Sequence, residues 1–187
     1  MKLAVLSLAP ALAVGSLLGG RLSALADLHV RFAPLAIVAF GMQLVNPPGR
    51  WPLVLLLGSF VLLSLVAVAN LRTTGFAIVL VGVAMNFAVI AANGGMPVDR
   101  EAIVASGQAS TLVALEEGAG VKHHLAGPDE RLRFLADVIA LPPPVAQVIS
   151  LGDVFTYGGI AVVAAAGMRR RHAPLAAPVG EAGRVEV

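Results

Sequence analysis

The chain of 187 residues contains no cysteine. This absence excludes disulfide bonds, a thiol nucleophile, an iron–sulfur cluster and any zinc site built on cysteine. Aromatic residues are also few, with 7 Phe, 1 Trp and 1 Tyr, and they do not alternate with basic residues as they do on nucleic-acid-binding surfaces. We therefore expect no nucleic acid among the partners.

Charged residues are scarce as well. They make up 13% of the chain, whereas soluble domains carry about a quarter, and 58% of the residues are hydrophobic. The water-facing area must therefore be small. A chain of this length, without a repeat or a linker, forms one compact unit.

Long apolar segments dominate what is present. A helix needs about 20 mostly apolar residues to cross the hydrocarbon core of a membrane. The five segments that approach this length are residues 3–18, 32–45, 51–69, 75–92 and 146–168. The sequence thus predicts an all-α fold, a polytopic membrane helix bundle with five transmembrane helices in a membrane domain at 1–168. Residues 169–187 are predicted to form a disordered cytoplasmic tail.

The first segment has two interpretations. Lys2, the apolar run and Ala24-Leu25-Ala26 imitate a cleaved secretory signal. If the segment is retained, the positive-inside rule places Arg169-Arg170-Arg171 inside. We expect the retained form, in the plasma membrane, with the N-terminus outside and the C-terminus cytoplasmic.

The connection at residues 93–145 is too long for a simple turn, and we expect it on the extracytoplasmic side. It opens with Asn93-Gly94-Gly95-Met96-Pro97, where Pro97 prevents a helix from continuing. We predict short helices at 99–105 and 110–117. A third, amphipathic helix is predicted from about Gly127 to about Leu141, on the membrane surface or the bundle mouth.

Polar and small residues follow one face of each of the last two spans. The fourth span carries Gly75, Gly82, Asn86 and Asn93. This stripe indicates either a packing seam between helices or a polar path to a substrate site.

The fifth span carries Gln147, Ser150, Asp153 and Tyr157 on one face. A carboxylate in a membrane helix costs about 2.5–3.5 kcal/mol near the centre, so Asp153 should face the bundle interior. It either hydrogen-bonds neighbouring loop backbone or forms a functional ionisable site.

Two aspartates form the one constellation that we expect to support chemistry unaided. The proline-rich turn at 142–144 separates Asp137 from Asp153 and can fold their carboxyl groups toward each other. Two carboxylates a few ångströms apart share a proton and act as general acid and base. Candidate substrate-binding residues around this pair are Asn93, Lys122, His123, Ser150 and Asn86.

No metal or cofactor is expected. Adjacent residues such as His123 and His124 usually point apart, and no chelating His spacing supports them.

The loop and the last span carry a recurring pattern of short motifs. The motifs are Asn93-Gly94-Gly95-Met96-Pro97, Lys122-His123, Leu135-Ala136-Asp137-Val138-Ile139, Leu141-Pro142 and Ser150-Leu151-Gly152-Asp153. In these the chain resembles a bacterial family of uncharacterised small integral-membrane proteins, from the first span through the last. The resemblance implies a membrane protein with a polar outer site.

Asn93-Gly94-Gly95, Asp137 and Asp153 are also similar to motifs of lipoprotein signal peptidase, a membrane aspartic protease. That resemblance implies a catalytic Asp137/Asp153 dyad and a substrate-positioning Asn93. The order differs, because in that family the Asn segment follows the first of four spans.

Three functions follow as hypotheses. The first is a membrane protein of unassigned activity whose outer loop forms a polar site, with membrane lipid around it and a lipid, peptide or small molecule as ligand. The second is the aspartic protease. The third is a small-solute transporter whose pathway is lined by Asn86, Gln43 and Asp153, although no inverted repeat supports it. A protein partner is left open by the sequence.

Overall fold

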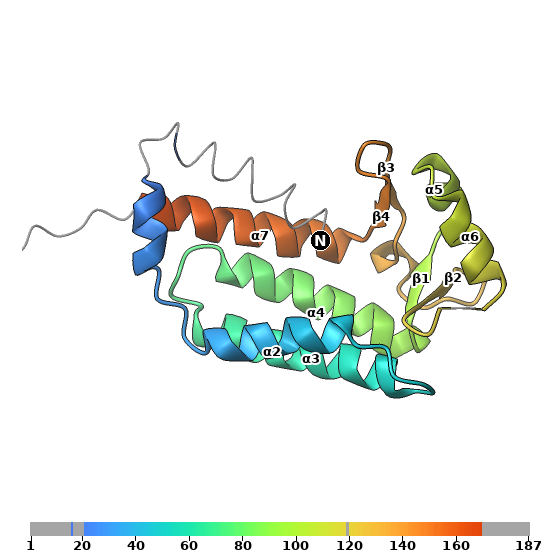
Figure 1. Cartoon of the computed structure of the whole chain (residues 1–187), viewed down its shortest axis with the longest axis horizontal. Coiled ribbons are helices and arrows are strands. Elements are labelled where there is room, and N and C mark those ends of the chain that lie inside the picture. The colour runs from blue at the N-terminus through green and yellow to red at the C-terminus, as the bar shows by residue number, and fades with distance from the viewer. Residues whose placement is uncertain (1–15, 17–20, 119, 170–187) are drawn as a thin grey trace, which may run out of the picture.

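The computed structural model describes Ser16, residues 21–118 and residues 120–169. Four helices lie side by side along its long axis, and a cap of short elements covers one end (Figure 1). The helices are α2 (Ala33–Leu44), α3 (Trp51–Ala69), α4 (Phe76–Asn93) and α7 (Leu151–Met168). The predicted first span at 3–18 and the predicted tail lie outside the described residues, except for Ser16 and Arg169.

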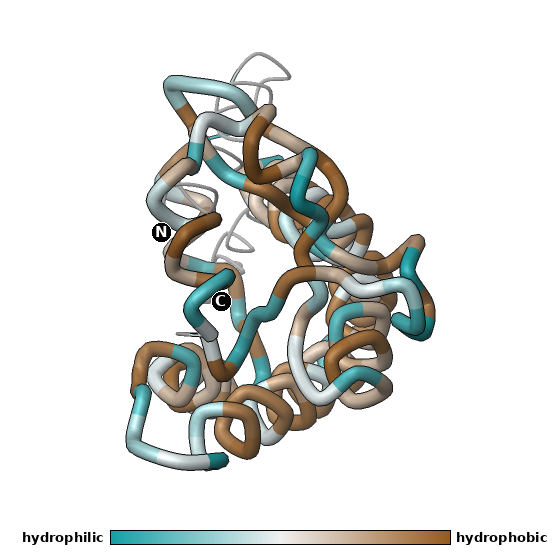
Figure 2. The backbone as a smooth tube through the Cα atoms, turned by 90° about the vertical axis from the view of Figure 1, so that its right-hand side faces the viewer, coloured by the Kyte–Doolittle hydropathy of each residue, from teal (hydrophilic) through white to brown (hydrophobic). Residues whose placement is uncertain are grey.

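Three of these helices, α3, α4 and α7, are long and apolar enough to cross a membrane. Many of their apolar side chains face outward, as do those of α2, and examples are Ile37 at 73% and Leu65 at 55% exposed. Figure 2 shows the same apolar character along the helices. Such exposure is expected where lipid replaces water as the solvent. The chain is therefore a membrane protein.

The number of five spans is not confirmed. α2 has 12 residues, which at 1.5 Å per residue gives roughly 18 Å, well short of the hydrocarbon core. The chain reaches α2 through the 3₁₀ helix η1 (Leu22–Asp27), which lies across the end of α7 away from the cap (Figure 1). At that same end, Asn70 donates hydrogen bonds to the carbonyls of Val66 and Arg31, at 2.7 and 2.9 Å. These bonds tie the start of α2 to the end of α3.

Glycines let α4 and α7 approach closely. A Cβ added to Gly75 would lie 2.8 Å from the carbonyl oxygen of Gly159, and one on Gly159 would lie 2.6 Å from the backbone nitrogen of Val79. Gly82 and Gly152 meet in the same way about two turns nearer the cap. The predicted packing seam is confirmed for Gly75, Gly82 and Asn86. Asn93 lies beyond it.

The cap contains both short helices predicted for it. They are α5 (Arg100–Ala105) and α6 (Ala109–Glu116), and the Asp99 side chain accepts a hydrogen bond from the Ala102 backbone at the start of α5. Before them, α4 ends at Asn93 because Gly94 adopts a left-handed conformation with φ of 70°.

The cap also contains four short strands, so the fold is mostly helical rather than all-α. β1 (Met96–Val98) pairs in parallel with β2 (His123–Leu125), and β3 (Ile139–Leu141) pairs antiparallel with β4 (Gln147–Ile149).

The predicted third loop helix is wrong. A short 3₁₀ turn, η2 (Arg133–Leu135), is followed by extended chain at Asp137 and then by β3. The backbone nitrogen of Asp137 donates to the carbonyl of Pro97 at 3.0 Å, and its carbonyl accepts from the nitrogen of Asp99 at 2.9 Å. This pairing with the end of β1 supplies the hydrogen bonds that a helix would have made.

The last helix begins at Leu151 rather than at residue 146, because residues 147–149 pair with β3 as β4. The β3–β4 hairpin returns the chain past the proline-rich turn. Asp137 therefore precedes the hairpin, and Asp153 follows it.

Candidate functional site

The first turn of α7 is built around Asp153. Its backbone nitrogen donates to Oγ of Ser150 at 3.0 Å, and its Oδ2 accepts from the backbone nitrogen of Ser150 at 3.2 Å. This reciprocal arrangement is a capping box, which satisfies two backbone donors that the helix start would otherwise leave unpaired. Asp153 therefore has the backbone-capping role that the sequence offered as one alternative.

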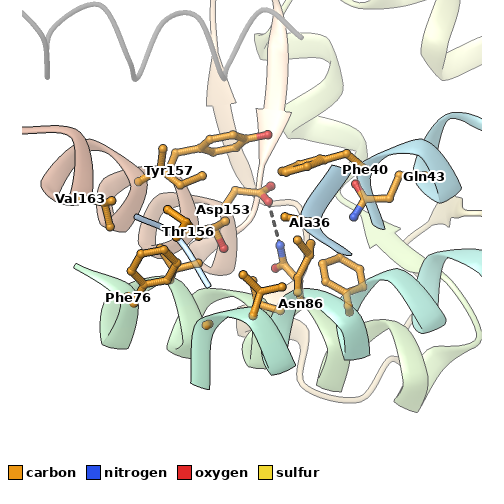
Figure 3. A pocket seen from close by; sticks show the side chains of 17 residues that line it. Ala36, Phe40, Gln43, Phe76, Asn86, Asp153, Thr156, Tyr157 and Val163 are labelled. Carbon is orange, nitrogen blue, oxygen red and sulfur yellow. Dashed lines mark hydrogen bonds between the residues drawn. The ribbon is translucent and has the colours of Figure 1, made fainter. Parts of the chain in front are cut away.

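Asn86 on α4 joins this turn from across the seam. Its Nδ2 donates to Oδ1 of Asp153 at 2.8 Å, and its Oδ1 accepts from Oγ of Ser150 at 2.9 Å (Figure 3). Asn86 is 5% exposed and Ser150 is fully buried. Each oxygen of the Asp153 carboxylate has one protein donor, and a carboxylate accepts about four hydrogen bonds, so acceptor capacity remains.

A cavity of about 340 Å³, here called the bundle cavity, lies between α2, α3, α4 and α7. Asp153, Asn86 and Gln43 line its end nearest the cap, with Thr156 and Tyr157 beside them. Figure 3 shows Asp153 between Asn86 and Tyr157, with Phe40 and Gln43 opposite. Phe76 and Val163 line the far end, and the remaining lining is almost entirely apolar.

Two of these polar groups retain unused hydrogen-bonding capacity. Gln43 donates through Nε2 to Oγ of Ser59 at 2.9 Å, which leaves its Oε1 as an acceptor. Oγ1 of Thr156 is buried and has no partner among the described residues.

Lys122 ties the cap to the end of α2. Its Nζ donates to the carbonyls of Gln43 at 2.6 Å and Val45 at 3.1 Å, which the helix end leaves without backbone partners. Burial lowers the pKa of Lys122. Lys122 thus holds loop and bundle together.

A second cavity of about 270 Å³, here called the cap cavity, lies within the cap. Asp137, Gln147 and His123 line it, together with residues of α5 and α6. Asp137 is 7% exposed, and its Oδ1 has no hydrogen-bond partner among the described residues. Burial raises the pKa of Asp137 well above its ordinary value, and the nearby charge of Asp153 adds to this.

The two adjacent histidines point to different partners. His123 lines the cap cavity and is partly exposed at the surface; desolvation of its ring lowers its pKa, although the charge of Asp153 opposes this. His124 pairs through Nε2 with Oε1 of Glu130 at 2.8 Å. Within the described part of the chain, no group of three His, Asp or Glu side chains is placed to hold a metal ion.

Apart from Lys122, which bonds the end of α2, the predicted site residues therefore fall into three places. Asn86, Ser150 and Asp153 form one hydrogen-bonded cluster at the bundle cavity, while Asp137 and His123 line the cap cavity. Asn93 belongs to neither, because its side chain exchanges two hydrogen bonds with the backbone of Arg131, at 2.8 and 2.9 Å. It fixes the loop to the end of α4.

Sequence reasoning missed Thr156 and left Tyr157 without a role. Both follow Asp153 by three and four residues, which is the spacing that puts side chains on one face of a helix. The signal was present, but it required knowing that this face borders a cavity.

A model of a family of unknown function, DUF5317, matches residues 23–165. The chain belongs to this family. The DUF5317 match covers η1, every helix from α2 to α6, the cap and most of α7, and it begins after the predicted first span rather than within it.

No curated protein and no solved structure matches the chain. The DUF5317 match agrees with the resemblance to an uncharacterised family, whereas the comparisons give no support to the resemblance to lipoprotein signal peptidase.

Proposed function

We propose that this protein is a multi-pass plasma-membrane protein that binds an amphiphile in the bundle cavity, with the head group of the ligand at Asp153 beneath the cap. One observation carries this proposal. The polar residues that α2, α4 and α7 contribute to the cavity all lie toward the same end of it.

The directions in which the helices run place these polar residues toward the cap. Gln43 is near the cap end of α2, Asn86 is two turns from the cap end of α4, and Asp153 is in the first turn of α7. Ligand sites that are mostly apolar with a few convergent polar groups orient their ligands in this way.

The free groups at the polar end are mainly acceptors. Asp153 keeps acceptor capacity on its carboxylate, and Gln43 offers Oε1. The hydroxyls of Thr156 and Tyr157 can accept or donate. A head group rich in donors, such as an ammonium or a set of hydroxyls, complements this end better than a phosphate or carboxylate would.

The apolar part of the cavity limits the ligand's chain. Phe76 and Asn86 line it from positions ten residues apart on α4, which is roughly 15 Å along the helix axis. A single alkyl chain of this length fits the cavity. Amphiphiles that carry such a chain are available from the surrounding membrane.

The orientation is part of the proposal. Four arginines lie at the bundle end away from the cap, where Asp27 is the one carboxylate among the described residues. They are Arg21, Arg31, Arg72 and Arg169. The positive-inside rule favours a cytoplasmic location for this end and an extracytoplasmic cap.

Equilibrium binding of radiolabelled dodecylamine to the full chain in phosphatidylcholine nanodiscs tests the function. We expect saturable binding that Tyr157→Phe weakens and that Asp153→Asn weakens roughly tenfold or more, because an ammonium–carboxylate bond is lost. Glu117→Gln, at an exposed position of the cap, should bind like the natural chain. Non-saturable partitioning, equal for all variants, would contradict the proposal.

The aspartic dyad remains the second candidate function. It is favoured by the electrostatic coupling of Asp153 to Asp137, since a shared proton requires two nearby carboxyls. Against it, the two residues line different cavities, and Asp153 is engaged in a capping box. A membrane-peptide hydrolysis assay in which Asp137→Asn and Asp153→Asn both abolish turnover would establish it, and full activity in either variant would end it.

A further inference from the structure

We propose that the cap cavity is a second binding site, independent of the bundle cavity, and that it takes a small organic cation with a primary ammonium group. Two residues that line this cavity each carry a buried oxygen atom that has no hydrogen-bond partner among the described residues. The two atoms are Oδ1 of Asp137 and Oε1 of Gln147.

These two atoms come from segments that the cap brings together. Asp137 bridges to Val98 at the end of β1, and Gln147 begins β4 after the proline-rich turn. The backbone of Asp137 is fixed on both sides by its bonds to Pro97 and Asp99. The backbone that carries the carboxyl group is therefore held in place, and the residue is 7% exposed.

An unpaired buried polar group costs about 1–3 kcal/mol, and more if it is charged, so native proteins seldom retain one without a use. Two such acceptors on one cavity call for a ligand that donates at least two hydrogen bonds. An ammonium group carries three donors.

The rest of the lining supports a cation. The described residues that line the cap cavity include neither lysine nor arginine. His123 also lines the cavity, and its neutral imidazole offers a further acceptor. Ile103 and Leu115 supply an apolar wall for the carbon atoms of the ligand.

The size of the cavity limits the ligand. Its volume of about 270 Å³ lies below the range of about 300–1,000 Å³ that holds drug-sized molecules. Ile103 of α5 and Leu115 of α6 line the cavity, and these two helices lie in the cap, beyond the end of the long helices (Figure 1). The ligand is thus a small, water-soluble amine rather than a lipid.

Ligand-observed NMR on the full chain in nanodiscs tests this site, with propylammonium as the probe and 1-propanol as the uncharged analogue. We expect saturation transfer to propylammonium and little to 1-propanol. Measured above the raised pKa of Asp137, where its carboxyl is ionised, Asp137→Asn should weaken propylammonium binding roughly tenfold or more, since a charge-assisted bond is lost. Asp129→Asn, which removes a carboxylate from an exposed position of the same cap, should not.

Two further measurements keep the result decisive. Thermal unfolding checks that Asp137→Asn is folded, and Gln147→Leu, which removes the second unpartnered oxygen, should also weaken binding. Dodecylamine binding in the bundle cavity should be unchanged in Asp137→Asn, which separates the two sites. Equal propylammonium signals in Asp137→Asn and Asp129→Asn would overturn the proposal. The absence of saturation transfer to propylammonium in the natural chain would also overturn it.

Discussion

The side chain of Asn86 donates a hydrogen bond of 2.8 Å to the carboxylate of Asp153, across 67 positions in the chain. This bond joins α4 to the first turn of α7, where the chain passes from the cap into the last helix. The carboxylate is thereby fixed at the polar end of the bundle cavity. The same cluster serves the fold and the proposed binding site.

Asn86→Ala should lower the free energy of unfolding by about 2–3 kcal/mol. The substitution leaves the buried Ser150 hydroxyl and one oxygen of Asp153 without their partner. Denaturant unfolding in detergent micelles measures the loss. Asn46→Ala, at an exposed position between α2 and α3, is the control and should change stability by less than about 0.5 kcal/mol.

Two neighbouring glycines on α7 should respond oppositely to alanine. A Cβ on Gly159 would press against the backbone of α4, whereas one on Gly158 would meet nothing within 4 Å. Gly159→Ala should therefore destabilise the protein by about 1–3 kcal/mol, and Gly158→Ala should be neutral or stabilising by up to about 1 kcal/mol. Melting temperatures of the two variants test this. Equal effects would contradict the close α4–α7 seam.

Lys122→Met should loosen the cap from α2. The variant keeps the aliphatic stem but loses two hydrogen bonds to the carbonyls of Gln43 and Val45, at a cost of about 1.5–3 kcal/mol. Amide hydrogen exchange should then accelerate in the turn at residues 45–50 and around β2. Unchanged exchange in both segments would show that Lys122 does not hold them together.

The stability conferred by Asp137 should fall as the pH rises. Burial raises the pKa of Asp137 above its ordinary value of 3.8, so the folded chain keeps this proton at a pH where the unfolded chain has lost it. Its contribution is therefore fully present below pH 3.8 and is lost as the pH climbs to the raised pKa.

Thermal unfolding of the natural chain and of Asp137→Asn over a pH series measures this effect. The natural chain should lose stability relative to the variant as the pH rises from 3.8, and the difference should then level off. Comparison with the variant cancels the titration of groups common to both chains to first order. A difference that does not depend on pH would show that the Asp137 carboxyl is not buried.

The sequence could predict those parts of the fold that depend on interactions between residues close together in the chain. α3 and α4 are continuous apolar runs, and Gly94 ends α4 where a left-handed residue is needed. The glycine stripe predicted the seam because small residues at helical spacing have few other uses in a membrane.

The cap escaped prediction because its strands depend on distant partners. Leu132, Leu135 and Ile139 have the spacing of a helix face, yet Asp137 pairs with Val98, 39 residues earlier. No local pattern contains that partner. Tertiary hydrogen bonding overrode the helical periodicity.

The sequence predicted which residues belong to the candidate site, but it predicted their arrangement only in part. Asn86, Ser150 and Asp153 were each selected as polar residues on buried helix faces, and they do meet. The bundle cavity was not predicted, since it depends on how four helices rotate against one another. That rotation is set by side-chain packing across the whole bundle.

The most direct test of the central claim is to locate a bound amphiphile by photo-crosslinking. Dodecylamine with a diazirine at its terminal carbon is irradiated with the full chain in nanodiscs, and labelled residues are identified by mass spectrometry. Our account predicts labels at the apolar end of the bundle cavity, at Phe76 and Val163, that unlabelled dodecylamine displaces and Asp153→Asn reduces. Labels confined to outward-facing residues such as Ile37 and Leu65, unaffected by competitor or variant, would contradict it.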